Sequence, residues 1–204
     1  MPWTCILLIA TDQASLALRR YASGKPCLAS GAGIHAARAR IGTAPIIVSE
    51  RGSWHVDSPA QPPATDPRWP EQCVCGYIFG PEDAYQLFRS RLYIRQDTGA
   101  LLMLAEAEPG MLWDAPWFLD FTPPWAGPDG RSLVMRLPGR GEWGIDGPSN
   151  NGPGWQRTGM PPSITVRPSI LSHGSGSVKG YHGWLTDGVL SDDLDGRTYV
   201  DEDR

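Results

Sequence analysis

The chain alternates short apolar runs with turns rich in glycine and proline. Seven segments have the apolar spacing and the flanking turn residues of β-strands. They are residues 3–10, 44–50, 91–104 with a turn at residues 97–99, 131–138, 142–146, 163–171 and 181–190. Glycine (24) and proline (20) together exceed a fifth of the chain, which favours short strands over long helices. Residues 58–70 contain five prolines and are expected to form an irregular connection.

One segment, residues 80–91, has the pattern of an amphipathic helix. Pro81 suits a first helical turn, and the acidic residues after it suit the positive end of a helix dipole. Ala84, Leu87 and Phe88 would share one face. The fold class expected is therefore α+β, mostly β, with short antiparallel strands and one clear helix. The C-terminal half should be a small β-sandwich or half-open barrel.

A change of composition indicates the domain organisation. Residues 109–130 are rich in Trp, Pro and Gly and lack periodicity. We expect an N-terminal α+β part at residues 1–108, a Trp/Gly-rich β module at 109–194 and an acidic tail at 195–204. Six of the last fourteen residues are acidic, so the tail is expected to add little to the core.

The net charge of −4 is distributed unevenly, and it limits the classes of partner. Residues 1–54 hold six basic and two acidic side chains, and only two residues of the whole chain are lysine. No local run of basic residues is present, which argues against a dedicated nucleic-acid binder. The apolar run at residues 5–10 is too short to span a bilayer and has no basic segment before it. We therefore expect a cytoplasmic protein with no membrane association.

Cysteine and histidine residues indicate a metal site. Cys73 and Cys75 form a Cys-x-Cys-Gly sequence, which can direct two thiolates at one ion. Cys27 and His35, in a glycine-rich segment, would complete a tetrahedral zinc site, and His55 competes with His35 for the fourth position. Four protein ligands would make such a zinc structural. The alternative is that these cysteines are simply buried thiols, as we expect for Cys5 in its apolar strand.

The segment GYHGWLTDGVL (180–190) predicts a hairpin with a candidate ligand surface. Asp187-Gly188 is typical of a type I′ turn. Strand alternation places His182 and Trp184 on one face, opposite Tyr181 and Leu185. A polar, glycine-rich loop could border that face and supply ligand-binding groups. Its candidate residues are Asp146, Ser149 and Asn150. The plainer alternative is that His182 has a structural role.

Two further features allow more than one interpretation. Trp113, Trp117 and Trp125 either fill one end of the β module or form a stacking platform for a planar ligand. A metal-dependent hydrolase using His182 and Asp146 is an alternative function, although no known hydrolase or phosphate-loop motif accompanies these residues.

Several segments together resemble a family of uncharacterised proteins encoded by tailed bacteriophages and prophages. They are DPRWPEQCVCGY (66–77), MLWDAPW (111–117), WAGPDGRSLVMRLP (125–138), EWGIDGPSNN (142–151), PPSITVRPSI (161–170) and GYHGWLTDGVL. The resemblance implies a phage or prophage origin and carries no established activity. We expect an accessory protein that binds a small molecule or a host protein without catalysis. A virion-associated structural component is a further alternative.

Overall fold

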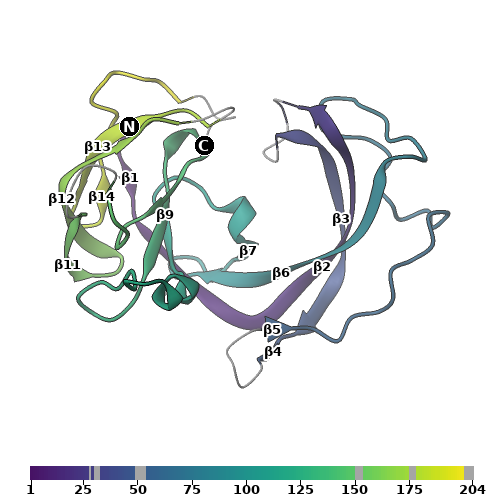
Figure 1. Cartoon of the computed structure of the whole chain (residues 1–204), viewed down its shortest axis with the longest axis horizontal. Helices are drawn as coiled ribbons and strands as arrows, with labels where there is room; N and C mark the ends of the chain where they lie inside the picture. Colours follow the sequence, from purple (N-terminus) through teal and green to yellow (C-terminus); the bar gives the residue numbers. More distant parts are fainter. Residues whose placement is uncertain (28, 30–32, 49–53, 150–153, 175–177, 200–204) are drawn as a thin grey trace. The chain divides into compact units, whose positions relative to one another are not determined.

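The computed structural model describes residues 1–27, 29, 33–48, 54–149, 154–174 and 178–199. The chain divides into two compact units (Figure 1). Unit 1 comprises Met1–Ala10 and Tyr93–Arg204, and unit 2 comprises Thr11–Leu92. This division differs from the boundary expected at residues 108–109. The first ten residues are grouped with the C-terminal half of the chain because β1 (Trp3–Thr4) pairs with β14 (Val189–Leu190), and the start of β2 (Ile6–Pro26) pairs with β8 (Met111–Asp114).

Unit 1 contains a five-stranded sheet in which every neighbouring pair of strands is antiparallel. Its order is β1 (Trp3–Thr4), β14 (Val189–Leu190), β13 (Tyr181–Thr186), β12 (Ser163–Ser172) and β11 (Gln156–Met160). Three short 3-10 helices also lie in this unit, η1 (Leu104–Glu106), η2 (Pro116–Asp120) and η3 (Pro138–Arg140). The strands expected at residues 163–171 and 181–190 are therefore confirmed.

A second sheet has seven strands. Its order is β10 (Glu142–Gly144), β9 (Leu133–Arg136), β8 (Met111–Asp114), β2 (Ile6–Pro26), β6 (Ala84–Arg95) and β7 (Leu101–Met103), with β3 (Ile34–Pro45) paired to β2. β2 pairs in parallel with β8 and antiparallel with β3. A separate two-stranded ladder joins β4 (Ile47–Val48) and β5 (Trp54–His55).

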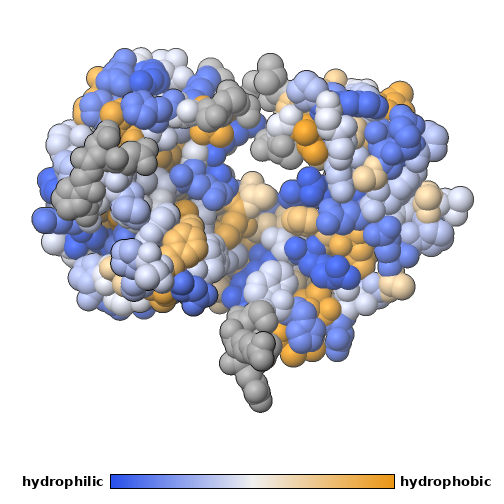
Figure 2. Space-filling view, in the orientation of Figure 1, coloured by the Kyte–Doolittle hydropathy of each residue, from blue (hydrophilic) through white to orange (hydrophobic). Residues whose placement is uncertain are grey.

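In unit 1, the five-stranded sheet and strands β8, β9 and β10 share one large hydrophobic core. Its buried members are Cys5, Leu112, Leu133, Met135, Leu137, Trp143, Ile145, Ile164, Val166, Ile170, Tyr181, Leu185, Leu190 and Tyr199. Most of them come from strands of both sheets, and Cys5, Leu137, Ile145 and Tyr199 lie in the segments beside the strands. Hydrophobic residues on the visible surface form separate patches among hydrophilic ones (Figure 2).

In unit 2 the even-numbered positions of β2 point into small hydrophobic clusters. Leu18 packs with Trp69 and Leu87, so the proline-rich connection covers this side of the sheet. Trp69 donates a hydrogen bond from Nε1 to the carbonyl oxygen of Pro63, at 2.9 Å. The odd-numbered positions Arg19 and Tyr21 point to the other side of the sheet.

The prediction of a helix at residues 80–91 is wrong, because this segment forms a turn followed by β6. Asp83 closes the turn, since its carboxylate accepts a hydrogen bond from the backbone N–H of Gly80 at 2.9 Å. From Ala84 the chain is extended, and Leu87 is buried while Gln86 is exposed. The apolar spacing fitted a helix and a strand alike, and pairing with β2 decided the outcome.

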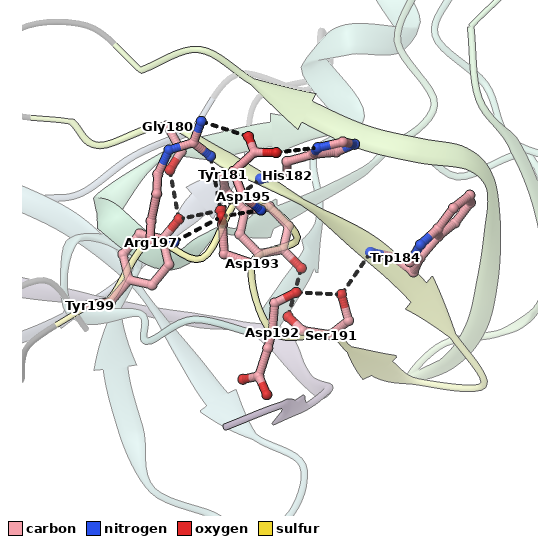
Figure 3. A network of polar contacts seen from close by, with 10 residues as sticks. All are labelled: Gly180, Tyr181, His182, Trp184, Ser191, Asp192, Asp193, Asp195, Arg197 and Tyr199. Carbon is pink, nitrogen blue, oxygen red and sulfur yellow. Dashed lines mark hydrogen bonds and ion pairs between the residues drawn. The ribbon is translucent and has the colours of Figure 1, made fainter.

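The prediction of a loosely attached C-terminal tail is also wrong for the part of the tail that the structure describes. Tyr199 is only 8% exposed and belongs to the core of unit 1. Its hydroxyl donates at 2.6 Å to the carbonyl oxygen of Gly180 and lies 2.8 Å from the carboxylate of Asp193 (Figure 3). Arg197 forms ion pairs with Asp193 and Asp195. The acidic residues therefore attach this segment to β13.

Candidate functional site

A hairpin in unit 2 brings Cys27 and His35 together. β2 ends at Pro26, directly before Cys27, and β3 returns alongside it. The backbone N–H of Cys27 donates to the carbonyl oxygen of Gly33 at 3.0 Å. His35 pairs with Ala22 and therefore points to the same side of the sheet as the buried residues of β2.

A tight turn presents Cys73 and Cys75 to the hairpin. The backbone N–H of Cys73 donates to the carbonyl oxygen of Tyr77 at 2.8 Å, and the N–H of Gly76 donates to the carbonyl oxygen of Cys73 at 2.9 Å. Gly76 has a φ of +92°, a conformation that residues with a side chain rarely adopt. The glycine of the Cys-x-Cys-Gly sequence therefore allows the turn that places both thiols on one side.

The structure brings the four predicted metal ligands into one cluster. One ligand atom each from Cys27, His35, Cys73 and Cys75 lies within 4.8 Å of all the others. The Sγ atoms of Cys27 and Cys73 are 4.0 Å apart, and Nδ1 of His35 is 3.2 Å from Sγ of Cys75. Tetrahedral zinc at its usual bond lengths would hold three sulfur atoms and one nitrogen atom roughly 3.5–3.8 Å apart. His55 lies on the exposed strand β5, outside this cluster.

Aromatic and charged side chains hold the ligands in place. The His35 ring stacks on Tyr77, with ring centroids 4.2 Å apart and an interplanar angle of 14°. The Tyr77 hydroxyl donates to Asp83 at 3.0 Å, and Nζ of Lys25 donates to the same hydroxyl at 2.5 Å. Phe79 packs against the two buried thiols, those of Cys27 and Cys73. The ring of His35 is thus oriented by a residue that is itself fixed by two polar contacts.

The local electrostatics favour the thiolate form of Cys73. Burial by itself would raise the pKa of this thiol. Hydrogen bonds from the backbone N–H of Cys75, the side chain of His35 and the backbone N–H of Ala36 have the larger combined effect and lower the pKa to about 7. A thiolate is the form in which cysteine binds a metal. Cys5 differs, because burial in the core raises the pKa of its thiol to about 12.

The C-terminal hairpin has the predicted geometry. Leu185 pairs with Leu190 and Thr186 with Val189, which leaves Asp187 and Gly188 as a two-residue loop. Both loop residues have positive φ, as a type I′ turn requires. Tyr181 and Leu185 are buried, and the opposite face carries His182 and Trp184.

The side chain of His182 is engaged by the C-terminal segment rather than by the loop around Asp146. Its Nδ1 lies 3.0 Å from Oδ1 of Asp195, and its backbone N–H donates to Asp193 at 2.9 Å (Figure 3). Sequence reasoning missed Asp193 and Asp195 as partners of His182, although both lie in the acidic stretch that follows the hairpin.

The other candidate ligand residues are placed separately. The Asp146 side chain is 3% exposed and accepts hydrogen bonds from Nε of Arg157 and from the backbone N–H of Leu133, both at 2.9 Å. Ser149 is half-buried. Asn150 lies outside the described residues. Asp146 therefore supports a buried ion pair, and its contacts do not include His182.

A hollow of about 480 Å³ lies beside Trp184, within unit 1. Its walls include apolar side chains, Pro2, Val189 and Leu194, and the acidic residue Asp192. Trp184 is 39% exposed, and the guanidinium of Arg167 lies 5.3 Å from its ring centroid. Of the predicted ligand residues, Trp184 lines this hollow.

The tryptophans of residues 113–125 have different environments. Trp113 is buried in a second cluster of unit 1, with Met111 and Val134. Trp125 stacks on Phe118 with centroids 4.6 Å apart. Trp117 is 47% exposed. Packing therefore accounts for Trp113 and Trp125.

Asp193 provides a test of how the C-terminal segment is attached. Burial would raise the pKa of this carboxyl, but hydrogen bonds from the backbone N–H of His182, the hydroxyl of Tyr199 and Arg197 lower it from 3.8 to about 2. Because the folded pKa lies below the unfolded one, this stabilisation is present at neutral pH and lost as the pH falls from about 5 towards 2. The lowered pKa of Asp193 contributes about 2 kcal/mol to the free energy of unfolding at neutral pH, and about half of this contribution should be lost by pH 3.

The pH effect can be measured by urea unfolding of wild type and Asp193→Asn at pH 7 and pH 3. We expect the stability advantage of the wild type to shrink by about 1 kcal/mol between these pH values. Comparing the two proteins at each pH removes the contribution of the other carboxyl groups. An advantage that is the same at both pH values would show that Asp193 is not held as described.

Comparison with protein-family models, curated proteins and solved structures finds no match to this chain. Among the described residues, no helix has the length and apolar character needed to cross a membrane.

Proposed function

We propose that unit 2 binds one structural zinc ion through Cys27, His35, Cys73 and Cys75. The observation that carries the proposal is the convergence of four ligand atoms from three separate segments, all within 4.8 Å of one another. Three sulfur ligands and one imidazole are typical of zinc sites. Four protein ligands complete tetrahedral coordination, so the ion would stabilise the fold rather than bind a substrate.

We further propose that the chain is a non-catalytic accessory protein of phage or prophage origin. It would bind a small molecule or a host protein through unit 1. The hollow beside Trp184 supports this proposal, because it combines apolar walls with a few polar groups, as ligand sites do. The buried ion pair of Asp146 with Arg157 argues against the hydrolase alternative. In that alternative Asp146 would act in catalysis, but its carboxylate is bound by Arg157 inside the protein.

Cobalt substitution tests whether the metal site is closed. Tetrahedral Co²⁺ bound to three thiolates and one imidazole gives intense visible absorption, which changes when a further ligand binds. We expect added cyanide, at a concentration that leaves the metal bound, to leave the spectrum of the wild type unchanged. His35→Ala should open a coordination position and make the spectrum respond. His55→Ala, a histidine of the same unit outside the cluster, is the matched control and should behave as the wild type. A wild-type spectrum that shifts with cyanide would contradict a structural role.

A further inference from the structure

The three thiols of the metal-ligand cluster differ in their access to solvent. Cys27 and Cys73 are 4% and 3% exposed, and Phe79 packs against both of them. Cys75 is exposed. Val74, the residue between the two cysteines of the turn, is 76% exposed, so this end of the turn projects into solvent. A small molecule in solution can therefore reach one of the three sulfur atoms directly.

The cluster also places a second sulfur atom close to Cys75. The ligand atoms of the cluster all lie within 4.8 Å of one another, so both buried sulfur atoms are within this distance of Sγ of Cys75. A disulfide bond is about 2.05 Å long, so two sulfur atoms would have to approach each other by about 3 Å at most. A change of one side-chain rotamer moves an Sγ atom by about this distance.

We propose that the cluster is a redox switch, in which a peroxide oxidises Cys75 and a disulfide from Cys75 to Cys27 or Cys73 then takes the place of the metal. The inference rests on the zinc site proposed above and adds the regulation of that site. Cysteine binds a metal as the thiolate, which is also its nucleophilic form. A solvent-accessible thiolate beside a second one is the arrangement found in redox-sensor cysteines.

The reaction has two steps, and hydrogen peroxide is the two-electron oxidant. The thiolate of Cys75 attacks one peroxide oxygen, the O–O bond breaks, and the products are a sulfenic acid and hydroxide. The thiolate of Cys27 or Cys73 then attacks Sγ of Cys75, the S–O bond breaks, and a second hydroxide leaves. Two protons from solvent convert the hydroxides into water. Two thiolates thus lose two electrons, and one peroxide gains them.

Formation of the disulfide would remove two of the four metal ligands. His35 and one thiolate remain, and two ligands do not complete the tetrahedral coordination of structural zinc. Because binding of structural zinc is coupled to folding, loss of the ion removes its contribution to the stability of unit 2. A dithiol reductant would regenerate both thiols by exchange, and the cluster could then bind zinc again. The stability of unit 2 would therefore follow the balance of peroxide and thiol around the protein.

Treatment of the full-length, zinc-loaded protein with hydrogen peroxide tests the switch. We expect native mass spectrometry to show loss of the zinc and a chain lighter by two hydrogen atoms than the reduced, metal-free chain. Peptide mapping should find one disulfide within the chain, and it should show whether Cys27 or Cys73 is the partner of Cys75. Dithiothreitol followed by zinc should restore the original mass.

Cys75→His separates metal binding from oxidation. Two cysteines and two histidines are also a common ligand set for zinc, so this variant can keep the metal while it lacks the exposed thiolate. It should lose zinc in peroxide at least tenfold more slowly than the wild type. Cys5→Ala is the matched control, because it removes a thiol that is 5% exposed in the core of unit 1, and it should behave as the wild type.

The outcomes distinguish the switch from the zinc site itself. An untreated wild type without zinc would contradict the site. A zinc-loaded wild type that keeps its zinc in peroxide, or a zinc-loaded Cys75→His that loses it as fast as the wild type, would overturn the switch and leave the site intact. Brief oxidation in the presence of dimedone, which labels sulfenic acids, gives a test on the wild type alone. Cys75 should be labelled first, and earlier labelling of Cys27 or Cys73 would equally overturn the proposal.

Discussion

Replacing Cys73 with serine should abolish zinc binding and remove the cooperative unfolding of unit 2. Among the described residues, the buried clusters of unit 2 contain only three or four residues each, against fourteen in the main core of unit 1. Structural zinc contributes roughly 10–16 kcal/mol in small zinc domains, which is as large as the whole stability of a typical domain. We expect calorimetry to show loss of one unfolding transition, and a strong chelator to have the same effect on the wild type.

His35→Ala and His55→Ala provide the matched comparison for this experiment. Both remove one imidazole from unit 2, but only His35 lies in the ligand cluster. His35→Ala should lower the unfolding temperature by more than ten degrees, because about 3 kcal/mol or more would be lost. His55→Ala should change it little, since the residue is exposed. Equal effects of the two substitutions would show that the cluster does not hold a stabilising metal.

Tyr199→Ala should lower the free energy of unfolding by about 3–5 kcal/mol, the usual cost of removing a large buried aromatic side chain. The ring is 8% exposed and packs edge-on against Trp3, with centroids 6.1 Å apart. Its hydroxyl also donates to the carbonyl oxygen of Gly180. Urea unfolding followed by tryptophan fluorescence would measure the loss.

Tyr199→Phe distinguishes the contribution of the ring to stability from that of the hydroxyl. This variant keeps the packing and loses only the polar contacts with Gly180 and Asp193, so it should cost about 1–2 kcal/mol. If Tyr199→Ala costs less than 1 kcal/mol, the C-terminal segment contributes little to the core and the original expectation from its composition was right.

Local sequence signals predicted the cluster of three cysteines and one histidine and the C-terminal hairpin. The Cys-x-Cys-Gly sequence and the Asp187-Gly188 turn each depend on a few adjacent residues, because glycine allows conformations that other residues avoid. The sequence left His35 and His55 as competing candidates. The structure places His35 in the cluster, because it lies on the strand that returns alongside Cys27. Strand alternation then correctly separated His182 and Trp184 from Tyr181 and Leu185.

Features that depend on distant partners were missed. The apolar positions Ala84, Leu87 and Phe88 fit a helix, and pairing with β2 made them a strand. The acidic composition of the tail concealed Tyr199, a single aromatic residue that anchors the segment. The register between β2 and β3, which pairs His35 with Ala22, is likewise specified by no short stretch of sequence.

Native mass spectrometry of the full-length protein, purified from cells without chelators, tests the central claim most directly. We expect one zinc ion per chain, retained in the wild type and in His55→Ala, and absent from Cys73→Ser. The same spectra would report any small molecule or host protein bound to unit 1. A wild-type chain that is folded and monodisperse but has the mass of the metal-free protein would contradict the zinc site. Cys27, Cys73 and Cys75 would then be thiols that bind no metal.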